Sequence, residues 1–209
     1  MAPVVRAPIK LPAPKRRSVP AARNAVLVQS RKRVASFAPL AAPDARVLIL
    51  GTMPGVASLA AGEYYAHPRN QFWTLMGELC GARAELPYAQ RCRILLESGV
   101  ALWDVFGSCV RPGSADSAIE LADAQLNNLA GFVKAHPILE RILCNGRLAQ
   151  ESFSRHSAAQ VALKFPKLQV LAVPSTSPAH AGMRLAQKLA LWRAAWPYPA
   201  APAASSARR

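Results

Sequence analysis

Short apolar runs alternate with segments of helical spacing over most of this 209-residue chain, and this alternation restricts its fold more than any other feature. Such runs suit buried parallel strands, which are covered on both faces. They stand at 46–50, 100–106, 141–146 and 168–174, and the helical segments at 70–80, 89–98, 127–137, 147–156 and 183–196. Strands that alternate with helices indicate an α/β fold: a three-layer α/β/α sandwich around a central, mostly parallel four-stranded sheet.

The basic residues are concentrated outside this α/β region. The chain has 26 Lys and Arg against 11 Asp and Glu, a formal charge of +15. Residues 1–42 contain nine basic residues and no acidic one, and they are rich in Pro and Ala, which is typical of disorder. We therefore expect a disordered arm (1–42), a folded domain (43–197) and a disordered tail (198–209). The arm could bind polyanions, act as a transit peptide, or result from an upstream start codon.

Other features of the composition exclude several classes of protein. No apolar run approaches the roughly 20 residues that span a bilayer, so no membrane partner is expected. A secretory signal is not expected either, because its apolar segment is missing. The cysteines are widely spaced and form no C-x-x-C pair, which predicts reduced thiols and no metal site: Cys80, Cys92, Cys109 and Cys144.

Polar and aromatic segments follow the ends of all four predicted strands. They read GTMPG…YYAHPRN, WDVFGSC, CNG and PSTSPAHAG. In open α/β sheets, ligands bind beyond the carboxyl ends of the strands. We therefore expect these loops to converge on one rim and to form a site there.

The residue types at this rim suit a planar ligand with polar edges. Tyr64 and Tyr65 could stack on such a ligand, or could simply pack within the loop. Asn145 offers one donor and one acceptor, or is only a turn residue before Gly146. Asn70 could hold a water molecule, or could cap the helix that follows it.

The remaining loop residues carry weaker signals. The turn at Pro54 and Gly55 leaves backbone groups for a ligand, but it matches neither G-x-G-x-x-G nor a P-loop, so a nucleotide cofactor is not expected. His67 taken alone is more often structural than catalytic. The STSPAHAG segment suits a rigid loop that contacts phosphates, although loops of this composition are common.

Taken together, these segments resemble the uracil-DNA glycosylase superfamily, and within it the hypoxanthine-DNA glycosylases, also called DNA-deoxyinosine glycosylases. The likeness covers about residues 45–197 and lies in GTMPG, YYAHPRNQFW, WDV with the later SC and GS-x-DS, the strand-end NG, and PSTSPA. The mismatch-specific uracil glycosylases are similar in the first turn and in AHP-x-N-x-FW. Their turn carries an asparagine that positions the hydrolytic water, where this chain has Met53. The hypoxanthine family shares this lack, which implies that Asn70 replaces that asparagine.

The resemblance implies a monofunctional DNA glycosylase that hydrolyses the N-glycosidic bond of a flipped deaminated base, with hypoxanthine (deoxyinosine) as the expected base. It implies no cofactor and no metal. Its partner would be DNA that contains deaminated bases, and the enzyme would be a cytoplasmic, nucleoid-associated monomer of bacterial type. The implied roles are catalysis for Asn70, base binding for Gly51, Met53, Pro54, Tyr65 and Asn145, and DNA binding for His67, Ser175, Ser177 and His180.

Two alternatives remain open from the residues. Uracil could be the main substrate of an enzyme of the same class. A non-catalytic nucleic-acid-binding module could use the same rim together with the basic arm. A Rossmann-like nucleotide enzyme is disfavoured, because its glycine fingerprint is absent.

Overall fold

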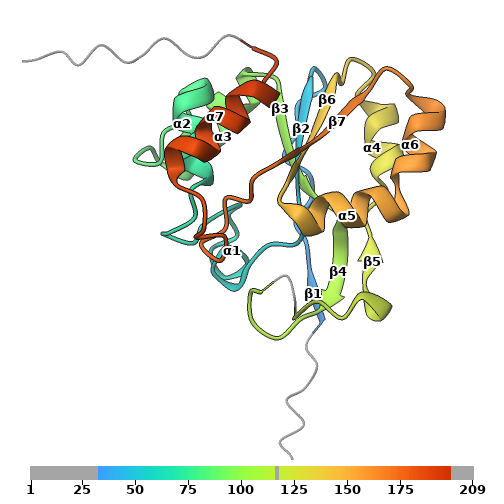
Figure 1. Cartoon of the computed structure of the whole chain (residues 1–209), viewed down its shortest axis with the longest axis horizontal. Coiled ribbons are helices and arrows are strands. Elements are labelled where there is room, and N and C mark those ends of the chain that lie inside the picture. The colour runs from blue at the N-terminus through green and yellow to red at the C-terminus, as the bar shows by residue number, and fades with distance from the viewer. Residues whose placement is uncertain (1–32, 116–117, 199–209) are drawn as a thin grey trace, which may run out of the picture. The chain divides into compact units, whose positions relative to one another are not determined.

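The fold is built on a parallel sheet formed by the four apolar runs of the sequence (Figure 1). The computed structural model describes residues 33–115 and 118–198. The strands are β2 (Val47–Gly51), β3 (Val100–Asp104), β6 (Arg141–Asn145) and β7 (Gln169–Val173), in the order β3-β2-β6-β7, and all their pairings are parallel. Every residue of the central strand β2 is buried, as a strand covered on both faces requires. The predicted four-stranded parallel sheet is confirmed.

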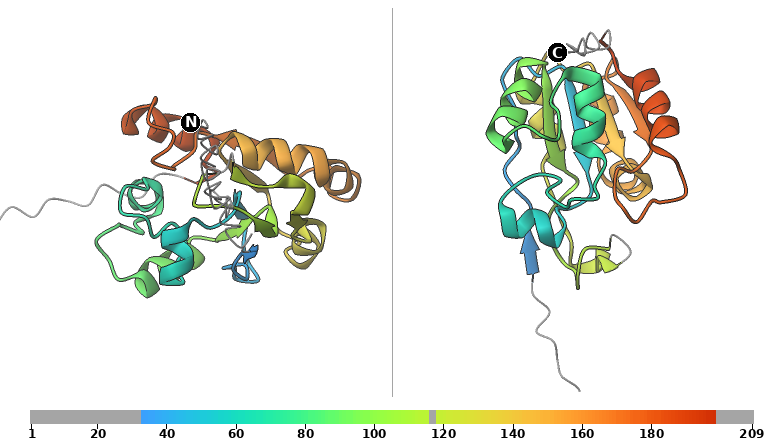
Figure 2. Two further views of the ribbon diagram at one scale, coloured as in Figure 1. Left: turned by 90° about the horizontal axis from the view of Figure 1, so that it is seen from below. Right: turned by 90° about the vertical axis from the view of Figure 1, so that its left-hand side faces the viewer.

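Helices cover both faces of this sheet (Figures 1 and 2). One face carries α2 (Phe72–Cys80), α3 (Tyr88–Glu97) and α7 (Leu185–Ala195), and the other carries α4 (Leu129–Ala135), α5 (Arg147–His156) and α6 (Ala158–Lys164). The side chains of β2 alternate between the two resulting cores, because successive residues of a strand point to opposite faces. The three-layer α/β/α architecture is confirmed.

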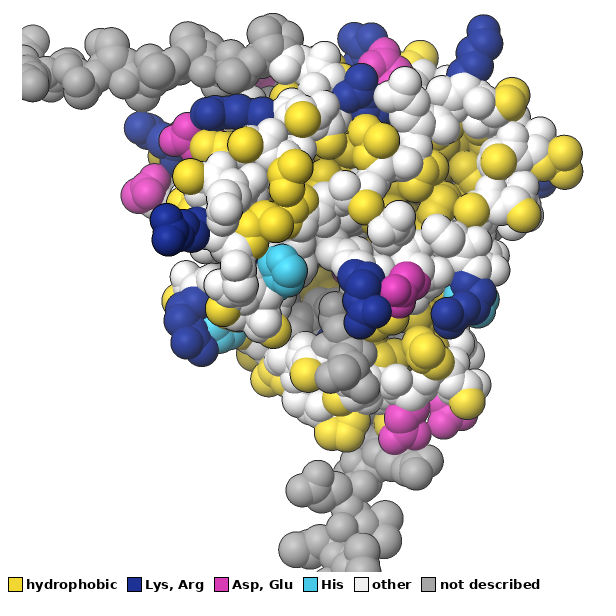
Figure 3. Space-filling view, in the orientation of Figure 1, with side chains coloured by type: hydrophobic (Ala, Val, Ile, Leu, Met, Phe, Trp, Pro, Cys, Tyr) yellow, Lys and Arg dark blue, Asp and Glu magenta, His cyan; other side chains and the backbone are white. Residues whose placement is uncertain are grey.

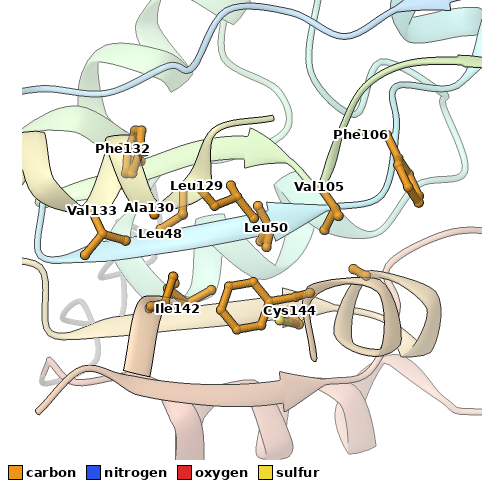
Figure 4. Close-up of a cluster of buried hydrophobic side chains, with 14 of the residues drawn as sticks. Leu48, Leu50, Val105, Phe106, Leu129, Ala130, Phe132, Val133, Ile142 and Cys144 are labelled. Atoms are coloured by element: carbon orange, nitrogen blue, oxygen red, sulfur yellow. The ribbon is translucent and has the colours of Figure 1, made fainter. Parts of the chain in front are cut away.

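The core on the α4–α6 side shows how the layers join. Leu48 and Leu50 of β2 lie beside Ile142 and Cys144 of the neighbouring strand β6 (Figure 4). Burial raises the pKa of the Cys144 thiol to about 12, so this thiol stays neutral near pH 7. All four cysteines are free thiols.

Among the described residues, no helix is both long enough and apolar enough to cross a membrane.

The predicted strand at 100–106 is two strands in the structure. β3 ends at Asp104, and β4 (Phe106–Val110) begins a second, antiparallel sheet of order β1-β4-β5, with β1 at Arg33–Ala35 and β5 at Gln125–Leu126. The chain leaves the parallel sheet where the Val105 and Phe106 amides donate to the Gly51 and Thr52 carbonyls, at 2.9 and 3.2 Å. β4 lies within a segment that the sequence assigned to strand end and polar loop. A 3₁₀ turn, η2 (Leu121–Asp123), precedes β5.

Residues 33–42 belong to the folded domain, which corrects the predicted arm of 1–42. Val34 of β1 pairs with Cys109 of β4, and Leu40 bridges to Leu102. The Phe37 ring also packs edge-on against Tyr64, with 5.1 Å between the ring centroids. This segment could not be recognised from composition, because a three-residue strand that begins with the exposed Arg33 and continues into Ala and Pro resembles the basic, Pro- and Ala-rich sequence before it.

The other predicted boundaries are only partly within the described residues. The arm from 1 to 32 and the tail from 199 to 209 lie outside them. Tyr198, which the sequence assigned to the tail, lies beside the Arg46 guanidinium, 5.9 Å from the ring centroid. A short helix that was not predicted, α1 (Val56–Ala61), follows the turn after β2.

The corrected boundary can be tested with two truncations. Removal of residues 1–40 should lower the free energy of unfolding by about 2–4 kcal/mol relative to removal of residues 1–32. The longer deletion takes away the β1 pairing and the packing of Phe37 on Tyr64. Urea denaturation of both proteins measures the difference. Identical midpoints and slopes would show that residues 33–40 contribute nothing to the domain.

Candidate active site

A cavity of about 130 Å³ lies at the carboxyl ends of the parallel strands. It is lined by the end of β2 and the segment that follows it, by the loop after β7, and by three single residues: Asp104 at the end of β3, Asn145 at the end of β6, and Ser114. In the right-hand view of Figure 2, α1 and the loop after β7 both lie at the lower end of the sheet. The cavity is smaller than the roughly 300–1,000 Å³ of a drug-sized site, so it suits a small ligand better than a nucleotide cofactor.

The turn after β2 brings its backbone close to two polar side chains. A Cβ added to Gly51 would stand 2.5 Å from Asp104 Oδ1 and 3.2 Å from the Tyr65 hydroxyl oxygen, so any larger residue would have to displace the Asp104 carboxylate. Gly51, Met53 and Pro54 all line the cavity, although Met53 is itself almost fully buried.

Tyr65 forms an aromatic wall of the cavity. Its backbone φ is +56°, a left-handed value that residues other than glycine rarely adopt. The neighbouring Tyr64 is held on both sides: its amide donates to the Tyr88 hydroxyl at 2.9 Å, and its carbonyl accepts from Trp73 Nε1 at 3.0 Å. The Tyr65 ring stacks on Phe72, with 3.8 Å between the centroids and 18° between the planes. A planar ligand in the cavity would therefore meet a tyrosine that is supported from behind.

The Asn145 amide is buried and its orientation is fixed. Nδ2 donates to the Tyr65 hydroxyl at 3.2 Å and to Thr176 Oγ1 at 3.0 Å, and Oδ1 accepts from the Thr176 amide at 3.0 Å. Gly146, with φ +102°, lets the chain turn from β6 directly into α5. Because an amide oxygen has two acceptor positions, Oδ1 can accept one further hydrogen bond.

Asn70 lies at the cavity and also contacts the start of the helix that follows it, whose N-cap position is Gln71. Asn70 Oδ1 accepts from the Phe72 amide at 2.9 Å, which supports the first turn of α2. The residue also lines the cavity. The bond from Phe72 uses one acceptor position of Oδ1, and the second is available for a water molecule.

The predicted DNA-contacting residues fall into two groups. His67, Ser175 and Ser177 line the cavity, whereas His180 is exposed and is not among the lining residues. The carbonyl of His180 accepts from Nζ of the buried Lys188 at 2.9 Å, and burial lowers the pKa of this lysine.

Sequence reasoning missed Thr176, which is almost fully buried between Ser175 and Ser177. It satisfies the Asn145 amide, and its carbonyl accepts from the Gln71 amide at 3.0 Å, so it joins the segments of Asn145 and Asn70. The composition of the loop indicated only small hydroxyl residues and gave no sign of which one is buried.

Asp104 and Arg111 were also missed. Asp104 is buried, lines the cavity, and accepts from Ser36 Oγ at 2.7 Å through Oδ2. The sequence placed Asp104 in the rim segment WDVFGSC but assigned no function to its carboxylate. Arg111 is buried behind the turn after β2, and nothing in the sequence distinguishes it from a loop arginine on the surface. Within 33–115 and 118–198, no three His, Cys, Asp or Glu side chains gather as metal ligands would.

Comparison with known proteins identifies similar chains. The model of the uracil DNA glycosylase superfamily matches residues 38–198. A protein named hypoxanthine DNA glycosylase from Methanosarcina barkeri is 34% identical over 116 residues, which cover 55% of this chain and 72% of that protein. One of the same name from Methanosarcina acetivorans is 36% identical over 109 residues, covering 52% and 68% respectively. A solution NMR structure from Methanosarcina acetivorans, provisionally named a uracil DNA glycosylase, matches with a TM-score of 0.66 and 28% identity, covering 79% of this chain and 97% of that one.

The close approach at Gly51 gives a test of the geometry of the cavity. Gly51→Ala should lower the free energy of unfolding by about 1–3 kcal/mol, because the new methyl group overlaps the Asp104 carboxylate. Gly182→Ala is the matched control: no atom lies within 4 Å of its added Cβ, and a change below about 0.5 kcal/mol is expected. Urea denaturation of both variants provides the measurement. Equal stability of the two variants would show that Asp104 does not pack against this turn.

Proposed function

Because the chain belongs to the uracil-DNA glycosylase superfamily, we propose that it is a DNA repair glycosylase that excises hypoxanthine from DNA. It is a hydrolase of N-glycosyl bonds, as members of this superfamily are. Its similarity to two proteins named hypoxanthine DNA glycosylase supports hypoxanthine as the base. The observation that carries the proposal is a single small cavity lined by Tyr65, Asn70 and Asn145.

The cavity suits a base that has left the duplex. A base within the helix is out of reach of a recessed site, so the target nucleotide must turn out of the stack. Tyr65 would then stack on the base, supported by Phe72. The second acceptor position of Asn145 Oδ1 would take the ring N–H of hypoxanthine, and the turn after β2 would face the base carbonyl. Adenine carries a lone pair at the position of this N–H and would be rejected.

The chemistry proposed is largely dissociative. An asparagine is a poor general base, so Asn70 orients the water through Oδ1 and does not have to deprotonate it before the bond breaks. The bond between C1′ and the base nitrogen breaks with its electron pair going to the base. The sugar becomes an oxocarbenium-like cation, water adds to C1′ and releases a proton to solvent, and the base takes up a proton. Electrostatic preorganisation of the cavity lowers the barrier.

Side chains that line the cavity, together with His180 outside it, would hold the DNA backbone. Ser175 and Ser177 would contact flanking phosphates from the loop after β7, with His67 and His180 beside them. On the face seen in Figure 3, Lys and Arg side chains are spread among Asp and Glu and do not form a single patch. Residues 1–32, with eight basic residues, would add sequence-independent attraction to DNA. One copy of the chain supplies every residue of the cavity, so the enzyme would act as a monomer on genomic DNA.

Base release decides between this function and its alternatives. Oligonucleotides with one deoxyinosine, deoxyuridine or deoxyxanthosine are incubated with excess enzyme, and the free base is quantified. Hypoxanthine should be released fastest. Faster release of uracil would make the chain a uracil glycosylase. Binding without release of any base would make it a nucleic-acid-binding module.

The catalytic role of Asn70 is tested by two substitutions. Asn70→Ala should lower the single-turnover excision rate by about two to three decades and leave DNA affinity nearly unchanged, because the contact with the water is lost. Asn70→Asp keeps an acceptor for both Phe72 and the water, and should retain more of the rate. Thermal unfolding of both variants separates the loss of the water contact from damage to α2. Excision by Asn70→Ala at the parent rate would exclude this role.

The reading of the base edge by Asn145 is tested by a change of charge. Asn145→Asp replaces the Nδ2 donor by a negatively charged oxygen, and should slow the release of hypoxanthine and uracil by an amount equivalent to about 1–3 kcal/mol. Asn128→Asp is the matched control, because it adds the same charge at an exposed helix cap whose oxygen accepts from Gly131. If Asn145→Asp releases hypoxanthine at the rate of the parent protein, Asn145 does not contact the base, and its function is limited to the turn before Gly146.

A further inference from the structure

Arg111 is a buried cation held by backbone carbonyls. It directly follows β4 and is 4% exposed. Its guanidinium donates to the Met53 carbonyl at 3.4 Å and to the Pro54 carbonyl. Among residues 33–115 and 118–198, no carboxylate lies within ion-pair distance of it, and its Nε has no hydrogen-bond partner there. Burial of a charge with only neutral partners costs several kcal/mol, which points to a function other than stability.

The turn after β2 separates this cation from the cavity. Met53, Pro54 and Gly55 line the cavity, whereas Arg111 does not. The peptide bonds of the described chain are trans, so the Gly55 N–H points opposite to the Pro54 carbonyl and therefore away from Arg111. The positive end of this peptide dipole and the positive charge of the arginine thus add to each other on the side of the turn that faces away from Arg111.

This potential has the sign that the proposed reaction requires. When the N-glycosidic bond breaks, its electron pair stays with the base, and negative charge develops inside the cavity. Fixed charges and dipoles act strongly in such a site, because it excludes water and because they need no reorganisation during the reaction. We propose that Arg111 is a positioning residue that stabilises the departing base as an anion, acting through the Met53–Gly55 turn. This proposal rests on the proposed glycosylase function.

Two substitutions of Arg111 separate its charge from its hydrogen bonds. Arg111→Lys keeps the charge and loses the forked donor geometry, whereas Arg111→Gln keeps amide donors and loses the charge. The Gln variant should lose about 100-fold in single-turnover excision of hypoxanthine, comparable to the loss of one transition-state donor. The Lys variant should stay within about tenfold of the parent. Both should bind deoxyinosine-containing DNA with the affinity of the parent, because a buried side chain does not contact DNA.

Arg91→Gln is the matched control. This arginine is also largely buried, lies 4.6 Å from the Trp73 ring centroid, and does not line the cavity. Its loss should reduce thermal stability without changing the excision rate. If Arg111→Gln excises hypoxanthine as fast as Arg111→Lys, or faster, the charge has no part in the reaction and the inference fails. If the parent protein releases no base at all, the proposed glycosylase function is wrong, and the inference about Arg111, which depends on it, is wrong as well.

A measurement on the parent protein keeps the inference testable even if the variants do not fold. Free hypoxanthine should inhibit excision more strongly as the pH rises through the pKa of the base itself, because a positive potential in the cavity favours its anion. Weaker inhibition by the anion than by the neutral base would overturn the inference.

Discussion

The buried Asn145 amide must be fully hydrogen-bonded, and this requirement joins the separate parts of the site. A buried amide without partners costs about 1–3 kcal/mol for each unsatisfied group. Thr176 supplies both an acceptor and a donor to it, at 3.0 Å each, and the Thr176 carbonyl accepts from the Gln71 amide. The strand end of β6, the loop after β7 and the segment before α2 are therefore fixed relative to each other. The positions of Tyr65 and Asn70 depend on this set of bonds.

The parallel sheet could be predicted from the sequence, whereas the antiparallel sheet could not. A central parallel strand is buried on both faces, so its apolar character is local and visible, as in β2. The strands β1, β4 and β5 are short and pair with segments far away in the chain: Val34 lies opposite Cys109. β1 and β5 are exposed or half-buried, which leaves no apolar run to read. Their existence is decided by tertiary pairing and not by local pattern.

The residues of the site likewise divide into those that the sequence predicts and those that only the tertiary contacts reveal. Tyr65, Asn70 and Asn145 follow strand ends, and the rule that ligands bind there brings them together without a structure. Thr176 and Arg111 acquire their functions from burial against distant segments, since Arg111 contacts a turn 58 residues away. A threonine in a polar loop and an arginine before a proline carry no local sign of such contacts. Asp104 was missed for a different reason: it lies in the rim segment WDVFGSC, but the sequence does not show that its carboxylate is buried at the cavity.

Several features that lower the stability of the fold lie around the cavity. Tyr65 has a left-handed backbone, Arg111 is a cation buried on neutral carbonyls, and the Asp104 carboxylate is buried beside Gly51. Features of this kind persist only where the surrounding structure holds them in place. Here the two apolar cores on either side of the sheet provide that support, and Ser36 of the N-terminal segment binds Asp104. Residues that composition assigned to a basic arm thus hold a carboxylate at the wall of the cavity, so the boundary of the domain and the geometry of the site are set by the same contact.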